Sequence, residues 1–106
     1  MAALRDRPAP GAIRVETPAV GAPTLSLDGE LDLASVDAFR TQLQALAERS
    51  SSVVVDMSHT TFIDGSVLGA LAGANAQFPD GVVVKGATGI VARVFRLGNM
   101  GHLLAE

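Results

Sequence analysis

Apolar and polar residues alternate in two short segments of the chain, residues 13–16 and 24–31. In the second segment the leucines at positions 25, 27 and 31 fall on one side of an extended chain. A period of two residues is typical of a strand with one buried face. Residues 18–23, which contain two prolines and a glycine, supply a turn between the segments. The pattern predicts an antiparallel hairpin whose second strand has a bulge or bend at Asp28-Gly29.

A helical period marks residues 35–49. Ser35 is the expected N-cap of this helix, and Asp37 lies in its first turn, where the helix dipole favours a negative charge. Apolar residues at steps of three and four form one stripe, which we expect to be buried. The members of this stripe are Val36, Phe39, Leu43 and Leu46.

Two further helices are expected over about residues 66–77 and 88–97, the second of which ends at glycines 98 and 101. In the last helix the inward residues are expected to be Ile90, Val91, Val94 and Phe95, and the outward ones Arg93 and Arg96.

Residues 53–57 and 82–84 are continuous runs rich in valine, which is typical of strands buried on both faces. Residues 58–65 are expected to form a loop, and Leu103-Leu104 a last short strand. Strands joined through a helix are normally parallel, with a right-handed connection. The sequence therefore predicts an α/β fold, in which three main helices pack on a mixed sheet of four to five strands.

The chain has 106 residues, the length of one domain. We expect residues 1–12, which are rich in proline, alanine and charge, to be a flexible leader, and residues 13–106 to be a single domain. The only aromatic residues are four phenylalanines, so the core must be mainly aliphatic.

Composition excludes several classes of function. The net charge is −3 and the basic residues are scattered singly, which argues against nucleic-acid binding. The absence of cysteine excludes disulfides and cysteine-ligated metals. The start of the chain lacks the apolar segment of a signal peptide, and no apolar run reaches the ~18 residues that a membrane helix needs. We therefore expect a cytoplasmic protein without direct membrane insertion.

Candidate catalytic groups do not combine into a site. His59 and His102 lie in different segments without a nearby pair of carboxylates, so we expect structural histidines and no bound metal. The acids at positions 28, 30 and 32 are expected to form a solvated strand edge. Residues 86–89 follow a strand and open a helix, but they lack a phosphate-loop motif, and a tight turn explains their glycines equally well. We expect no catalysis and no cofactor.

Ser66 lies at the predicted start of the second helix, in the segment Phe62-Ile63-Asp64-Gly65-Ser66-Val67-Leu68-Gly69. Free amides and the helix dipole favour negative charge there, so the fold would tolerate a phosphate on Ser66. That phosphate would add roughly −1.5 to −2 charges to the surface. The alternative is that Asp64 or Ser66 only caps the helix.

The helix that follows Ser66 has two different faces. One is the apolar stripe of Val67, Leu71, Ala74 and Phe78, and the other has only the small residues Gly69, Ala72, Gly73 and Ala76. Each glycine in a helix costs about 1 kcal/mol relative to alanine, which is unusual in a purely structural helix. A bare face lets another protein approach closely, or it packs against a neighbouring helix of the same domain. Self-association through this face also stays open.

The strand end Leu27-Asp28-Gly29-Glu30-Leu31-Asp32, then a helix, a Val-Val-Val-Asp strand and the Ser66 segment together resemble STAS domains, the anti-sigma factor antagonists. In that family a G-E-L-D strand end precedes the first helix, and a D-S-S-G-L-like motif opens the second. The resemblance covers about residues 13–104 and includes the predicted order of strands and helices.

The resemblance implies a phosphorylation switch. Ser66 matches the serine that a partner kinase phosphorylates, Asp64 the acid two residues before it, and Asp32 the acid near the partner-binding surface. The implied partner is an anti-sigma factor that is also a serine kinase with a histidine-kinase-like ATPase fold. The unphosphorylated antagonist binds this partner and frees the sigma factor, and the phosphorylated form releases it. The expected partner-binding residues are Asp32, Asp64, Gly65, Val67, Gly69 and Gly73.

Two positions depart from the family motif. Gly65 replaces the first serine, and Val67, a stiff β-branched residue, stands where the family has glycine. Val67 favours an alternative function, a non-catalytic STAS accessory subunit of a membrane transport or other signalling complex. Such a subunit would dock through the same helix face without phosphorylation control.

Overall fold

The computed structural model describes residues 12–31 and 33–105. The predicted leader therefore lies outside the described residues except for Ala12, which is the first residue of strand β1 (Ala12–Glu16).

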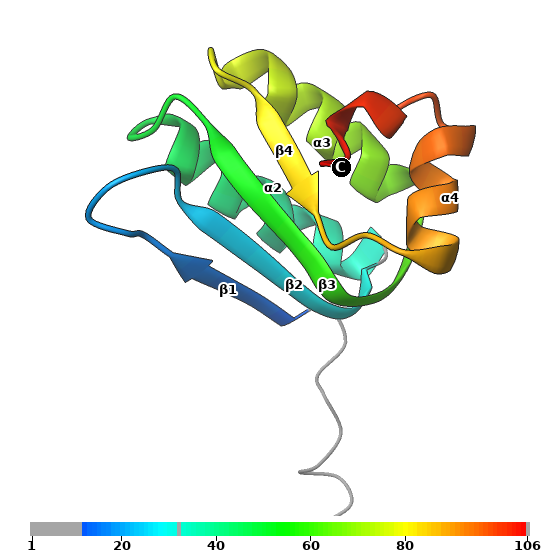
Figure 1. The fold of residues 1–106 in the computed structure, drawn as a ribbon. Coiled ribbons are helices and arrows are strands. Elements are labelled where there is room, and N and C mark those ends of the chain that lie inside the picture. Colours follow the sequence, from blue (N-terminus) through cyan, green and yellow to red (C-terminus); the bar gives the residue numbers. More distant parts are fainter. Residues whose placement is uncertain (1–11, 32, 106) are drawn as a thin grey trace, which may run out of the picture.

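A four-stranded sheet in the order β1-β2-β3-β4 forms one layer of the molecule (Figure 1). Strand β1 is antiparallel to β2 (Thr24–Leu31), while β2, β3 (Val53–Ile63) and β4 (Val82–Lys85) are parallel to one another. This confirms the predicted α/β fold with an antiparallel first pair. The register of β2 against β3 shifts on both sides of Asp28-Gly29, and Gly29 has a φ of 85°, so the predicted irregularity is also confirmed.

Helices α2 (Leu33–Ala47) and α3 (Gly65–Gln77) lie behind the sheet in Figure 1, and α4 (Gly89–Leu97) lies at one end, followed by the short 3-10 helix η1 (Gly101–Leu103). The core between sheet and helices is mainly aliphatic, as expected. Of the four phenylalanines, three are buried and Phe62 is 41% exposed.

The valine runs are buried on one face only. Val53 and Val55 are buried, whereas Val54 between them is half-buried, and Val83 of β4 is 43% exposed. The prediction of strands buried on both faces is therefore wrong, because α2 and α3 pack on the same face of the sheet.

Residues 58–63 continue strand β3 and do not form the predicted loop. They find backbone partners along β2, with His59 opposite Asp28 and Ile63 opposite Leu31. The threonines, phenylalanine and isoleucine of this segment favour strands, but their polar neighbours hide the pattern in the sequence.

Helix α2 begins at Leu33, so Ser35 lies inside the helix and is not its N-cap, and Asp37 lies beyond the first turn. Leucine and alanine favour helix, which is consistent with the earlier start. Helices α3 and α4 match their predicted ranges to within one residue.

Val91, Ala92 and Phe95 are the buried residues of α4, and Val94 is half-buried against the core, whereas Ile90 is 57% exposed, contrary to expectation. The buried stripe is centred between positions 91 and 95, so Ile90 is turned away from the core. Leu104 makes a single bridge to Val84, and no further strand forms in the described residues.

Candidate partner-binding site

The first turn of α3 is fixed by Asp64, which is the N-cap. Its backbone is extended, with a φ of −119°, and its Oδ1 accepts a hydrogen bond from the backbone nitrogen of Ser66 at 3.0 Å. The Ser66 hydroxyl donates to the same oxygen. Asp64 thus satisfies an amide that would otherwise lack an intrahelical partner, and it also orients the hydroxyl.

Ser66 is half-buried at the second position of α3. The residue before it, Gly65, is exposed, and a Cβ added there would meet no described atom within 4 Å. The Ser66 side chain is therefore held in place on one side and approachable on the other.

The small residues of α3 form an open strip that we call the glycine ridge: Gly65, Gly69, Ala72, Gly73 and Ala76. All five are exposed, and a Cβ added at any of the three glycines would meet nothing described within 4 Å. Helix α2 packs against α3 beside this strip, and Ala70 and Ala74, which border the same groove, are each 5% exposed. The alternative in which the ridge packs against a neighbouring helix of the domain is therefore wrong for the described residues.

A groove of about 250 Å³ separates α2 from α3 and runs along the ridge. Its α2 wall is made by Arg40 and Gln44, and its α3 wall includes Gly69, Gly73 and Gln77. The sequence analysis missed Arg40 and Gln44. They are exposed residues one helical turn apart, and only the pairing of α2 with α3 brings them beside the ridge.

Two of the predicted partner-binding residues, Asp32 and Val67, are not part of the exposed site that the structure describes. Asp32 lies outside the described residues. Val67 is 1% exposed and belongs to the core stripe with Leu71, so its side chain cannot contact a partner. Its departure from the family motif therefore acts on core packing, and its assignment as a contact residue is wrong.

Residues 86–88 connect β4 to α4, whose first residue is Gly89. Gly86 has a φ of +78°, and an added Cβ would lie 2.8 Å from the backbone nitrogen of Ser58 and 2.9 Å from its Cα. The close approach of two backbones therefore requires glycine. His59 and His102 are both exposed, and no group of three potential metal ligands occurs in the described ranges.

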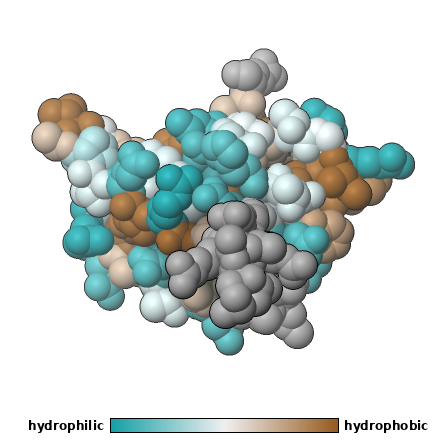
Figure 2. All heavy atoms as spheres, turned by 90° about the horizontal axis from the view of Figure 1, so that it is seen from below, coloured by the Kyte–Doolittle hydropathy of each residue, from teal (hydrophilic) through white to brown (hydrophobic). Residues whose placement is uncertain are grey.

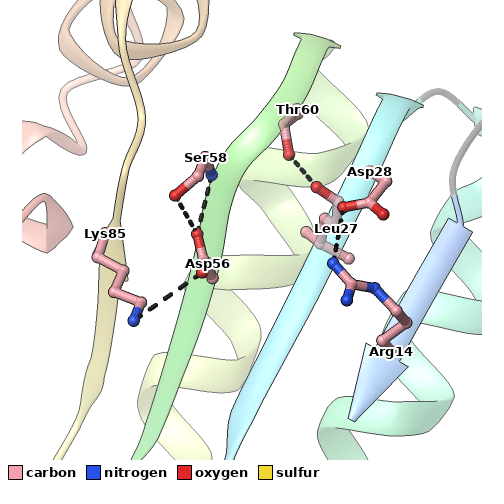
Figure 3. Close-up of polar contacts among 7 residues, drawn as sticks. All are labelled: Arg14, Leu27, Asp28, Asp56, Ser58, Thr60 and Lys85. Atoms are coloured by element: carbon pink, nitrogen blue, oxygen red, sulfur yellow. Dashed lines mark hydrogen bonds and ion pairs between the residues drawn. The ribbon is translucent and has the colours of Figure 1, made fainter. Parts of the chain in front are cut away.

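Among the described residues, several separate polar contacts lie on the side of the sheet that faces away from α2 and α3 (Figure 3). Asp56 Oδ1 accepts hydrogen bonds from the nitrogen of Ser58 at 2.9 Å and from its hydroxyl at 2.5 Å, and Lys85 Nζ lies 3.9 Å from Oδ2. The hydrogen bonds from Ser58, aided by Lys85, lower the pKa of Asp56 despite partial burial. Arg14 pairs with Asp28 at 3.2 Å.

A second hollow, of about 730 Å³, lies at the bulge of β2 and is lined by Asp28, Ser58 and Thr60 among others. The Thr60 hydroxyl donates to the carbonyl of Leu27 at 2.6 Å, and Ser58 donates to Asp56. The Thr60 and Ser58 hydroxyls are thus engaged in hydrogen bonds to other residues of the sheet, so the glycine ridge is the better candidate site.

Known proteins resemble the chain over most of its length. A solved structure of unphosphorylated SpoIIAA, an anti-sigma factor antagonist, matches with a TM-score of 0.80 and 19% identity over 89% of this chain and 86% of that one. The Bacillus SpoIIAA in its phosphorylated form matches with a TM-score of 0.71 and 18% identity, covering 89% of each chain. An anti-sigma factor antagonist from Mycobacterium paratuberculosis matches with a TM-score of 0.77 and 24% identity over 88% of this chain and 81% of that one.

The murine anion transporter Slc26a9 matches with a TM-score of 0.58 and 14% identity over 95% of this chain but 19% of its own. No curated protein matches the chain in sequence. Within the described ranges, no helix has both the length and the apolar character required to cross a bilayer.

The structural likenesses establish the fold, and a comparison with family models establishes the family. The model described as "Mlab, STAS domain" matches residues 16–105. The match includes β2, the Asp64–Ser66 cap and the whole glycine ridge. The chain therefore belongs to the STAS domain family, as the resemblance in its sequence predicts.

Proposed function

We propose that the chain is a cytoplasmic anti-sigma factor antagonist that binds its anti-sigma factor through the glycine ridge. We further propose that this partner is a serine kinase with a histidine-kinase-like ATPase fold, and that phosphorylation of Ser66 releases the complex. The structural likeness to anti-sigma factor antagonists, among them SpoIIAA in its unphosphorylated and phosphorylated forms, supports this role.

One observation carries the proposal: Ser66 shares a helix face with the exposed, bare residues Gly69 and Gly73. Residues three and seven positions apart in a helix lie on the same side. A protein that covers the ridge would therefore cover Ser66 as well, and a phosphate there would lie inside the interface.

The location of the phosphate inside the interface matters because a switch requires a large difference in binding free energy between the two phosphorylation states. Changing a bound-to-free ratio from 99:1 to 1:99 needs about 5.5 kcal/mol of differential affinity. A charge stranded in a close-packed, desolvated contact costs several kcal/mol, whereas a charge on an exposed rim is screened by salt. Only a phosphate within the footprint suffices.

Asp64 adds to the effect of a phosphate. The Ser66 hydroxyl donates to Asp64 Oδ1, and phosphorylation removes that proton. The phosphate would then lie beside the capping carboxylate and repel it. The helix N-terminus offsets this repulsion within the fold, so the main loss is expected in the complex.

The first test is incubation of the purified chain with candidate anti-sigma factor kinases and ATP, followed by mass spectrometry of the phosphorylated position. The second compares partner affinity of the wild type with Ser66→Ala and Ser66→Asp. We expect Ser66→Ala to bind and Ser66→Asp to lose most of its affinity.

The matched control is Ser51→Asp, which places the same charge at an exposed position before the start of β3, whereas Ser66 follows the end of that strand. Strand β3 has 11 residues, roughly 35 Å of extended chain, and lies between the two positions. This control should bind like wild type. Equal binding by wild type, Ser66→Ala and Ser66→Asp would refute the switch.

A second candidate function is that of a non-catalytic accessory subunit of a membrane transport or signalling complex. The fold likeness to a domain within the Slc26a9 transporter favours it. In this case the ridge would dock a transporter or ATPase domain, and Ser66→Asp would bind that domain as well as wild type does.

A further inference from the structure

The outer face of α4 exposes an apolar strip that is not part of the glycine ridge. Ile90 is 57% exposed and Leu97 is 76% exposed, with the half-buried Val94 between them. These positions recur at steps of four and three, so they line one side of the helix. Figure 2 shows hydrophobic atoms gathered at the right-hand end of the molecule, the side on which Figure 1 places α4.

The same region has a charge opposite to that of the chain. Residues 81–105 contain Lys85, Arg93 and Arg96 and no acidic residue, while the whole chain has a net charge of −3. Arg93 and Arg96 are both exposed. On a helix with 3.6 residues per turn they lie together on one flank of the apolar strip.

The strip is rigidly attached to the domain. Phe95 is fully buried, and a Cβ added at Gly98 would lie 2.5 Å from Cδ1 of Leu68 in α3. Glycine therefore lets the end of α4 pack closely on α3. A preorganised apolar surface loses little entropy when a partner binds.

We propose that the face of α4 formed by Ile90, Arg93, Val94, Arg96 and Leu97, here called the α4 strip, docks an acidic amphipathic helix of a partner protein. The three apolar residues span seven positions, about 10 Å, which matches two turns of a partner helix. The two arginines on one flank select carboxylates beside the apolar anchors.

Other occupants fit the strip less well. Two copies that pair through α4 bring arginines of like charge together. A nine-residue helix is short for binding at a lipid surface, where stable attachment needs a larger buried apolar area. The α4 strip does not involve Ser66 and is independent of the function proposed above.

The test is a titration of the isotopically labelled full chain, followed by amide resonances, with a helical peptide of about 14 residues that has leucines at steps of four and three and glutamates beside them. A second peptide carries lysine in place of every glutamate, and a third probe is a vesicle of phosphatidylserine and phosphatidylcholine. We expect the glutamate peptide alone to bind and to shift the amides of residues 89–98.

Leu97→Ser should weaken binding of the glutamate peptide about tenfold, the effect of losing one apolar anchor. Val20→Ser is the matched control, because Val20 is 90% exposed in the β1–β2 loop, and this variant should bind like wild type. Ser66→Asp should also leave peptide binding unchanged, which separates this proposal from the phosphorylation switch. No binding of the glutamate peptide, equal binding of the lysine peptide, binding of the vesicles instead, or shifts centred outside α4 would overturn the proposal.

Discussion

Alanine at Gly69 and Gly73 tests the glycine ridge through two readouts that should change in opposite directions. Both glycines lie in the interior of α3, and a Cβ at either position would meet no described atom within 4 Å. Alanine should therefore fit without a clash. The stability of the isolated chain should rise, while its affinity for a partner on the ridge should fall.

The size of the stability gain follows from the open surroundings. Without clash or new burial, the change is the difference in helix propensity, about 1 kcal/mol for each glycine replaced by alanine. For a domain of this size, that gain raises Tm by roughly 4–8 °C per substitution. Because neither added Cβ meets a described atom within 4 Å, the double variant should gain about 2 kcal/mol.

The binding loss has a different cause. Two methyl groups would stand where a partner's backbone is expected to approach most closely, and a gap or a shift in the interface should weaken binding about tenfold or more. Urea unfolding followed by circular dichroism measures the first effect, and calorimetric titration with the anti-sigma factor measures the second.

The matched control is Ala72→Gly, which lies on the same exposed ridge and should lower stability by about 1 kcal/mol without adding bulk. Lower stability of the alanine variants would show that the ridge is covered after all. Higher stability with unchanged affinity would show that the partner binds elsewhere.

Three further predictions concern the support of the site, all measured by urea unfolding. Gly86→Ala should lower stability by about 2–4 kcal/mol, because alanine there combines a left-handed φ with a clash against Ser58. The control Gly89→Ala, with φ +55° and no neighbour within 4 Å, should lower stability by only about 1–2 kcal/mol. Equal losses of stability in the two variants would contradict the role of the Ser58 contact. Asp64→Ala should cost about 0.5–2 kcal/mol through loss of the α3 cap, and an unchanged midpoint would show that the cap is not needed. The hydrogen bonds from Ser58 lower the pKa of Asp56, so the folded state binds a proton at Asp56 less readily than the unfolded chain does. The contribution of Asp56 to stability is therefore fully present above the usual pKa of about 3.9. It is lost as the pH falls through the lower pKa that Asp56 has in the folded state. The deficit of Asp56→Asn relative to wild type should therefore shrink between pH 7 and acidic pH, and a constant deficit would refute this linkage.

Much of α3 is predictable from local sequence. Asp64 caps the helix through a contact with a residue two positions away, and the period of Val67, Leu71 and Ala74 identifies the buried face. The small residues then necessarily fall on another face. The hairpin is local as well, because alternation specifies its strands, and a glycine marks the position at which the register of β2 against β3 shifts.

Other features depend on partners distant in the chain. Residues 58–63 extend β3 because β2 supplies their backbone hydrogen bonds, and no local sequence pattern predicts that pairing. In the same way, Ile90 has an apolar side chain but is exposed, because the position of α4 against the sheet places Phe95 inward instead.

The amino-acid pattern alone thus establishes the order of the elements, the capped start of α3 and the grouping of its small residues on one face. It leaves undecided whether that face is covered, and it gives no sign that Arg40 and Gln44 border it. Both depend on the side from which α2 approaches α3. Periodicity sets which residues of one element lie together, whereas exposure results from contacts between elements far apart in the chain.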